Sequence, residues 1–263
     1  MTPSHEVRAD SVHPGCVLDW DELATIWSVF EGRGLTTTHL DALAEEIRPP
    51  VGVLGAGRGL LVGCLSRRFG VAAVEGYEGS DEMLRQAAAA GRREIRRSTL
   101  NDPIPATRPL QTLIVATGVL DPFENDEIAV LLERAARVLR PNGRLLLAFF
   151  RVDSPLGRHS AALGADHALG ARWPLLLRHA MAGDERLVGV RAMIRRVASA
   201  RACGEPEAAA WLERVLPRVR RLFEPDDLVP LLRRVGLTDL EVRDDLDPDV
   251  SILIASRVET ARR

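Results

Sequence analysis

The chain has 263 residues, 46% of them hydrophobic, and a formal net charge of −2 at pH 7. All 35 basic residues are arginines, which excludes chemistry that depends on a Schiff-base lysine or on the lysine of a phosphate-binding P-loop. The nearly neutral charge provides no global field to attract a polyanion, so nucleic acid is not the expected partner.

Cysteine spacing and hydropathy exclude further classes of protein. Cys16, Cys64 and Cys203 lie far apart and form no C-x-x-C pair, so the sequence predicts neither a zinc site nor a disulfide framework. Residues 1–18 are polar and lack a signal-like apolar run, and no stretch of 18 uncharged apolar residues occurs. We therefore expect a cytoplasmic protein without a membrane anchor, with residues 1–18 as a polar leader.

The first half of the chain alternates helices with short apolar strands. Helical spacing of apolar residues, divided by Gly32 and Gly34, predicts two N-terminal helices within residues 19–48. The elements expected next are a strand over 51–54, a helix over 60–69, a strand over 71–77, a helix over 80–90 with Ser80 as its N-cap, and a weak strand near Ile95.

The second half continues this alternation and then interrupts it. The elements expected here are a strand over 113–116, an amphipathic helix over 126–139 ended by Pro141-Asn142-Gly143, a strand over 144–150, a helix over 225–235 capped by Gly236, and strands over 240–243 and 251–256. Residues 151–222 form a helical, arginine-rich insertion that we expect to act as a lid. Because strands that alternate with helices form parallel sheets, residues 19–263 are expected to form one α/β domain.

The turn after the strand at 51–54 is rich in glycine, with the sequence Gly55-Ala56-Gly57-Arg58-Gly59. Such a turn aims backbone N–H groups and the positive end of a helix at a ligand, and glycine lets the ligand approach closely. Tight packing of the strand against the helix is the alternative reason for the glycines. Leu60 stands where the dinucleotide fingerprint requires its last small residue, which argues against a dehydrogenase.

Glu78 follows the second expected strand, about twenty residues after the glycine turn. A carboxylate at this position can accept hydrogen bonds from both hydroxyls of a ribose. A solvated loop acid is the alternative interpretation. Together, the turn and Glu78 indicate a nucleoside-containing cofactor.

These segments resemble, in the same order, the motifs of class I S-adenosylmethionine-dependent methyltransferases of the small-molecule type. The most specific match is residues 133–147, with the sequence ERAARVLRPNGRLLL. The other matching segments are residues 51–59 for the first motif, 76–84 for the second, 98–105 for the loop after the third strand, 113–120 for the fourth strand, and 223–256 for the C-terminal helix and hairpin.

The resemblance implies a Rossmann-like class I methyltransferase fold. This fold has a seven-stranded, mostly parallel sheet with an antiparallel C-terminal strand, helices on both faces, and here a helical insertion before the C-terminal hairpin. It also implies S-adenosylmethionine as the cofactor and a small organic acceptor methylated on oxygen or nitrogen. The residues that it places around the cofactor are Gly55, Ala56, Gly57, Gly59, Glu78, Gly79, Met83, Thr99, Leu100 and Thr117.

Two positions depart from the family pattern and keep a second function open. Val53 stands where the first motif usually has an acid for the amino group of the cofactor, and Thr99 stands where an aspartate is usual, with Asp102 as a possible substitute. These departures favour the alternative of a methyltransferase-fold protein that binds no cofactor or does not methylate.

Catalytic residues are harder to identify, because methyl transfer is an in-line displacement that depends mainly on alignment and on exclusion of water. His159 and His167 in the insertion and Asp121 after the fourth strand are the candidates for a base. Ordinary surface or packing histidines, and an Asp-Pro turn at Asp121, are the alternatives.

The insertion also carries arginines and tryptophans that need interpretation. Its arginines between 191 and 221 alternate with Glu205, Glu207 and Glu213, which is typical of a solvated helix face, and aromatic residues do not interleave with them. An RNA methyltransferase is therefore the less favoured alternative. Trp173 and Trp211 are expected either to pack in a helical core or to line an apolar acceptor pocket.

Overall fold

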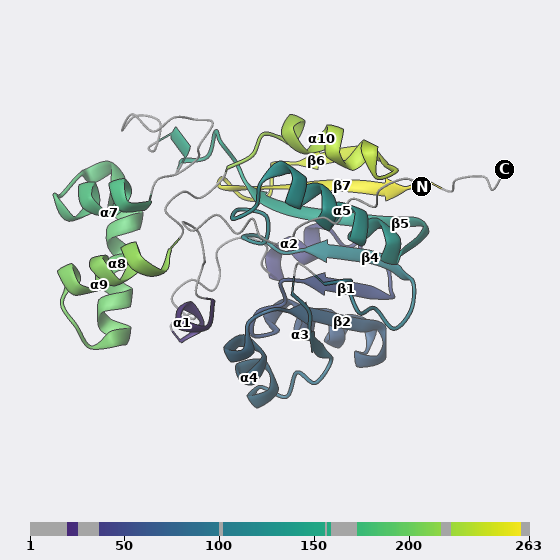
Figure 1. Cartoon of the computed structure of the whole chain (residues 1–263), viewed down its shortest axis with the longest axis horizontal. Coiled ribbons are helices and arrows are strands. Elements are labelled where there is room, and N and C mark those ends of the chain that lie inside the picture. Colours follow the sequence, from purple (N-terminus) through teal and green to yellow (C-terminus); the bar gives the residue numbers. More distant parts are fainter. Residues whose placement is uncertain are drawn as a thin grey trace, which may run out of the picture.

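A computed structural model describes residues 20–25, 37–99, 102–155, 157–158, 173–216 and 222–258. At its centre lies a seven-stranded sheet in the order β3-β2-β1-β4-β5-β7-β6 (Figure 1). The strands are β1 Val51–Leu54, β2 Val74–Glu78, β3 Ile95–Arg97, β4 Leu110–Val115, β5 Leu139–Phe150, β6 Leu237–Arg243 and β7 Val250–Arg257. The sheet predicted from the sequence is confirmed.

The strands β1 to β5 are parallel and bring their carboxyl ends to one edge of the sheet. β1 pairs with β2 and β4, β2 with β3, and β4 with β5. In this register Val53 lies opposite Gly76 on one side and Ile114 on the other. The strand order reverses at β1, and in open α/β sheets the crevice at such a point holds the ligand. β7 is antiparallel to both β5 and β6, as expected for the C-terminal strand.

Helices cover both faces of the sheet. Around the sheet lie α1 Trp20–Ala24, α2 Thr37–Ala42, α3 Leu60–Phe69, η2 Val71–Ala73, α4 Asp81–Ala89, α5 Asn125–Val138 and α10 Pro225–Arg234. Apolar residues of α5 and α10 form one buried cluster with the strands, and those of α2 and α3 form a second cluster. Leu113 and Val115 of β4 belong to the first cluster and Ile114 to the second, because successive strand side chains point to opposite faces.

The predicted helical insertion is also confirmed where it is described. It contains α7 Trp173–Met181, η4 Glu185–Leu187, α8 Val188–Arg201 and α9 Glu205–Val215. These helices lie beyond the carboxyl ends of β1 and β4 (Figure 1). Trp173 and Trp211 are only 5% and 6% exposed, so both pack as core residues.

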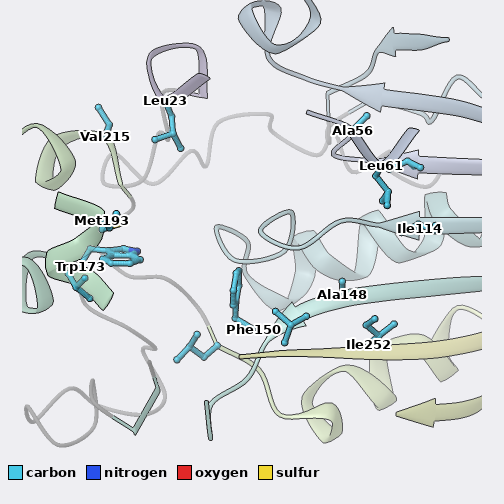
Figure 2. Close-up of a cluster of buried hydrophobic side chains, with 14 of the residues drawn as sticks. Leu23, Ala56, Leu61, Ile114, Ala148, Phe150, Trp173, Met193, Val215 and Ile252 are labelled. Carbon is cyan, nitrogen blue, oxygen red and sulfur yellow. The ribbon is translucent and has the colours of Figure 1, made fainter. Parts of the chain in front are cut away.

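The second apolar cluster continues from the sheet into the insertion. Figure 2 shows both parts of this cluster, with Ala56, Leu61, Ile114, Ala148, Phe150 and Ile252 on the side of the sheet, and Leu23, Trp173, Met193 and Val215 on the side of the insertion. The insertion is therefore packed against the domain through apolar side chains that include those of α1.

Several boundaries match the sequence prediction and others differ from it. β1 and α3 have the expected bounds, Ser80 caps α4, and Gly236 follows α10 with a left-handed φ of 79°. β2 begins only at Val74, because residues 71–73 form the 3-10 helix η2, in which Val71 is 62% exposed.

β5 begins earlier than predicted, directly after α5. Leu139 pairs with Leu110, whereas Arg144 pairs with Thr112, so residues 140–143 form a bulge within the strand. Asn142 adopts φ 59° in this bulge, a left-handed conformation that asparagine tolerates better than most residues. The preceding helix ends at Val138, one residue before the predicted end, and Pro141-Asn142-Gly143 belongs to the bulge of β5 and not to a separate turn.

The second N-terminal helix is shorter than predicted, and most of the first expected helix lies outside the described residues. α1 ends at Ala24, and α2 ends at Ala42 because the amides of Ala44 and Glu46 bond to carbonyls three residues back, which tightens the chain into turns. The dividing residues Gly32 and Gly34 and the leader at 1–18 lie outside the described residues.

Within the described ranges, no helix is both long and apolar enough to cross a membrane. The same residues contain no group of three or more His, Cys, Asp or Glu side chains arranged to hold a metal ion. Cys64 and Cys203 are free thiols, and Cys16 lies outside the described residues.

Candidate functional site

The glycine turn is attached firmly to the end of β2. The amides of Gly55 and Ala56 both donate to the carbonyl oxygen of Tyr77, at 2.9 and 3.0 Å. Gly55, Gly57 and Gly59 all have positive φ, at 74°, 54° and 83°, which other residues adopt only with strain. The backbone of this turn therefore has one defined path over the edge of the sheet.

Two of the three glycines have a packing reason as well. A Cβ on Gly55 would clash with the side chain of Val119, and a Cβ on Gly59 would lie 2.5 Å from Ile95 Cδ1. The packing alternative raised by the sequence thus applies to Gly55 and Gly59. Gly57 differs from them, because its amide donates to a carboxylate, at 2.7 Å from Glu78 Oε2.

Glu78 faces the glycine turn from the carboxyl end of β2. Its Oε1 accepts the amides of Gly79 and Ser80, at 2.8 and 2.9 Å, while Oε2 accepts the amide of Gly57. Burial raises the pKa of Glu78 and outweighs the three backbone hydrogen bonds, which lower it. The interpretation of Glu78 as a solvated loop acid does not fit this geometry.

A carboxylate has about four acceptor positions, two on each oxygen. Because Oε1 accepts two of the hydrogen bonds above and Oε2 only one, an acceptor position is left on Oε2. That oxygen lies on the side of Gly57, where the turn exposes its backbone. Glu78 can therefore accept a hydroxyl hydrogen from a ligand without losing its present contacts.

The start of α4 holds Glu78 in place. Ser80 acts as the N-cap, since its hydroxyl oxygen accepts the amide of Met83 at 3.1 Å, and Met83 itself is buried. The same hydroxyl donates to Asp21 Oδ1 of α1 at 2.5 Å, and that carboxylate also accepts the amide of Glu82 at 3.1 Å. The sequence analysis missed Asp21, because no local motif indicates that a residue 59 positions away contacts Ser80.

The loop after β3 approaches the same edge. A Cβ on Gly79 would lie 3.5 Å from the carbonyl oxygen of Ser98 and 3.7 Å from Thr99 Cα. The Thr99 hydroxyl donates to Asp102 Oδ2 at 2.6 Å, so the structure brings a carboxylate to the position where the sequence lacks one. Leu100 lies outside the described residues.

The hydroxyl of Ser98 stands out in this loop. It is buried, with the residue only 5% exposed, and Oγ has no hydrogen-bond partner among the residues that the structure describes. A buried hydroxyl without a partner is costly, and it is usually satisfied by water or a ligand.

The loop after β4 completes the edge. The amide of Ala116 donates to the carbonyl oxygen of Leu54 at 3.0 Å, and Gly118 turns the chain with φ 89°. Thr117 between them is partly exposed, whereas Asp121 is buried at 5% exposure. The structure thus brings Gly55–Gly59, Glu78, Thr99 and Thr117 to one end of the sheet, at the ends of four parallel strands.

Other residues singled out in the sequence are not part of this group. Val53 is 1% exposed and packs in the second apolar cluster, so no carboxylate occupies its position on β1. His159 and His167 lie outside the described residues. In the insertion, Arg195 pairs with Glu205 at 3.2 Å, which agrees with a solvated helix face rather than a bare basic surface.

A comparison with protein families matches the part of the chain that contains this site. Residues 51–143 match a family model described as a methyltransferase domain. This match begins at β1 and ends within the bulge of β5, so it contains the ends of all four strands that form the site. A search of the curated proteins finds no match.

Solved structures share the fold at low sequence identity. Human N-acetylserotonin methyltransferase in complex with SAM is 18% identical with a TM-score of 0.50, over 92% of this chain and 56% of that one, so this chain spans about half of the human enzyme. An S-adenosylmethionine-dependent methyltransferase from Mesorhizobium loti is 17% identical with a TM-score of 0.55, over 84% and 98%. A possible histamine N-methyltransferase from Thermotoga maritima is 14% identical with a TM-score of 0.51, over 89% and 91%.

Proposed function

We propose that this chain transfers the methyl group of S-adenosylmethionine to a small organic acceptor. Its residues 51–143 match the model of a methyltransferase domain, and its fold is similar to that of S-adenosylmethionine-dependent methyltransferases. The observation that carries the proposal is the Glu78 carboxylate, which faces the amide of Gly57 across the ends of β1 and β2. This pair combines an acceptor for ribose hydroxyls with exposed backbone at a glycine turn.

The residues at the sheet edge fit an adenosine. Oε2 of Glu78 has an acceptor position left for a ribose hydroxyl, and Gly57 allows close approach of the sugar. On the side of β3, Ser98 Oγ lacks a hydrogen-bond partner within the described residues, and Thr99 and Asp102 present a hydroxyl and a carboxylate. We assign these three polar residues to the base, and Thr117 to the methionine part of the cofactor.

The acceptor is proposed to be small and uncharged or weakly charged. The insertion beyond the strand ends is built around buried apolar side chains such as Trp173 and Met193, which belong to the same cluster as apolar side chains of the sheet (Figure 2). We base the proposal of an apolar acceptor on these apolar surroundings. Arginines of the insertion are paired with acids, which does not favour RNA. The cytoplasmic location stays a prediction.

When bound, S-adenosylmethionine supplies a methyl group that its sulfonium already activates, so the chain's own residues need to align the reactants and exclude water. The insertion is proposed to act as the lid that excludes water. Asp121, buried just beyond β4, is the described candidate for accepting a proton from the acceptor, and His159 and His167 remain candidates by sequence.

One observation favours a second function. Val53 lies within an apolar cluster, so β1 supplies no carboxylate to the amino group of the cofactor. A domain that keeps the methyltransferase fold without methylating anything is consistent with this feature. Transfer of label from methyl-tritiated S-adenosylmethionine to any acceptor would exclude this alternative.

Isothermal titration with S-adenosylhomocysteine tests the proposed cofactor site. We expect measurable binding by the unmodified chain and none by Gly57→Trp, because the indole would fill the space next to Glu78. Gly189→Trp is the matched control, since a Cβ on Gly189 of α8 meets nothing within 4 Å, and it should bind normally. Absence of heat with the unmodified chain at millimolar ligand would contradict the proposed function.

A further inference from the structure

The short helix α1 lies between the insertion and the start of α4 (Figure 1). Two consecutive carboxylates on this helix reach in different directions, Glu22 to α9 and Asp21 to the first turn of α4. Neither belongs to a motif of the methyltransferase family in the sequence. The contacts of α1 therefore connect two parts of the molecule that the sheet does not connect.

Glu22 binds the insertion through a compact polar cluster. Its Oε1 accepts the indole N–H of Trp211 at 2.6 Å, and its Oε2 accepts from Arg214 Nη1 at 2.8 Å. The hydrogen bond from Arg214 is the largest of the effects that leave the pKa of Glu22 below its usual value. Arg201 stacks on the indole ring of Trp211, 4.5 Å from its centroid, which fixes the orientation of the N–H.

Asp21 binds the loop that positions Glu78. It accepts from Ser80 Oγ and from the amide of Glu82, and so adds a second cap to the start of α4. Ser80 in turn donates its own amide to Glu78. The side chain of Gln86, one turn further along α4, donates to the carbonyl oxygen of Ala24 at 3.0 Å. The position of α1 is thus tied to the residues around the ribose-binding carboxylate.

The covalent connections of the insertion lie at a different place. The chain leaves the sheet at Phe150–Val152 and returns at Phe223, where the amide of Phe223 donates to the carbonyl oxygen of Phe150 at 2.9 Å. Arg151 and Phe223 form a parallel bridge, and the rings of Phe149 and Phe223 meet edge to face. Both connections therefore cross at one point, which has the layout of a hinge.

From this layout we propose that α1 is a strap that fastens the insertion to the Glu78 loop, and that the contacts of Glu22 must open before the bound nucleoside can leave. Asp21 and Glu22 are positioning residues in this proposal, which rests on the proposed function for the identity of the nucleoside. When the strap is closed, hydrogen bonds join Arg214 to Glu22 and Asp21 to Ser80 and on to Glu78, and the backbone of α1 connects the two acids.

The strength of the strap suits reversible opening. The side chain of Arg214 is 62% exposed and that of Glu22 26%, and ion pairs of this kind contribute little net stability in water. The hydrogen bond from Trp211 is stronger because the indole is buried and the acceptor is charged. Loss of Glu22 should therefore release α9 without unfolding the domain.

Hydrogen exchange without any ligand tests the strap independently of the cofactor. We expect Glu22→Ala to speed amide exchange in α9 and also at residues 79–83, which Glu22 does not touch. Glu205→Gln removes the charge with which Glu205 pairs with Arg191 and Arg195 within the insertion, and it serves as the matched control, with unchanged exchange at 79–83. Unchanged exchange at 79–83 in Glu22→Ala would overturn the proposal.

Stopped-flow dissociation of S-adenosylhomocysteine tests whether the strap must open before the nucleoside can leave. We expect dissociation about 10-fold faster in Glu22→Ala, about 3-fold faster in Arg214→Gln and unchanged in Glu205→Gln. Equal dissociation rates in all four proteins would show that the strap does not limit release of the nucleoside. If the unmodified chain binds no S-adenosylhomocysteine, the proposed function fails, whereas the exchange experiment still decides whether α1 couples the insertion to the Glu78 loop.

Discussion

Two glutamates on the same strand show how a structural acid differs from a candidate ligand-binding acid. Glu75 near the start of β2 and Glu78 at its end are both screened from solvent, and each accepts three hydrogen bonds. The donors to Glu75 are the hydroxyl of Tyr77 and the amide and hydroxyl of Thr107, with Arg108 Nε 3.8 Å away. The donors to Glu78 are backbone amides alone.

The difference in donors has a consequence for charge. Burial raises the pKa of Glu75, but the hydrogen bonds from Thr107 and Tyr77 together outweigh it, so the pKa ends below the usual value of 4.5. For Glu78 burial outweighs the hydrogen bonds, and the pKa ends above that value. The folded chain stabilises the charged form of Glu75 relative to the unfolded chain. It destabilises the charged form of Glu78, and a donor from a ligand would offset this.

The largest expected effect separates the two acids by ligand affinity. Glu78→Ala should weaken binding of S-adenosylhomocysteine by about 100-fold, because the hydrogen bond from a ribose hydroxyl to a charged acceptor is lost and the Gly57 amide loses its partner. Glu75→Gln should change the affinity by less than about 3-fold, since Glu75 lies at the opposite end of the strand. Isothermal titration measures both, and equal losses in the two variants would remove the distinction.

A smaller effect separates them by stability. Glu75→Gln should lower the free energy of unfolding by about 2 kcal/mol, because Gln keeps only one acceptor oxygen for the hydrogen bonds from Tyr77 and Thr107 and loses the negative charge that faces Arg108. Glu78→Gln should lower the free energy of unfolding much less, because burial of the charged Glu78 carboxylate is itself unfavourable and a neutral amide avoids that cost. Urea unfolding by circular dichroism gives both values, and a greater loss in Glu78→Gln would contradict this assignment.

The smallest expected effect is that the contributions of Glu75 and Glu78 to stability change in opposite directions with pH. The folded pKa of Glu75 is lowered, so its contribution to stability is present above about pH 4.5 and is lost as the pH falls through the folded pKa. The folded pKa of Glu78 is raised, so its contribution is present below about pH 4.5 and is lost as the pH rises through the folded pKa.

Urea unfolding between about pH 3 and pH 7 measures how the free energy of unfolding changes with pH. The Gln variants serve as references, because their side chains do not titrate. The stability of the unmodified chain relative to Glu75→Gln should grow as the pH rises, and relative to Glu78→Gln it should shrink. Two curves that change in the same direction would show that the two carboxylates have similar environments.

The sequence was most informative where the physical signal is local. A buried four-residue strand, a glycine turn and a helix follow one another between Val51 and Phe69, and each depends on neighbours within a few residues. The same holds for Ser80, whose cap on α4 is a contact with Met83. Glu78 could be placed at the end of its strand, and parallel pairing then brought it to the glycine turn.

The features that the sequence did not reveal depend on distant contacts or on competition between local forms. The contact between Glu22 and Trp211 joins residues 189 positions apart, and no periodicity records such a pair. The apolar run at Val71–Ala73 satisfied a strand pattern but lies where the chain turns, and the bulge at 140–143 required knowledge of the register with β4.

The central claim is that the free acceptor position of Glu78 receives the ribose of an adenosine held over Gly57. A crystal structure of the chain with S-adenosylhomocysteine measures this directly. The account predicts a ribose hydroxyl within hydrogen-bond distance of Glu78 Oε2 and the nucleoside against the backbone of Gly57. A nucleoside bound elsewhere, with Glu78 contacting only its three backbone amides, would contradict it.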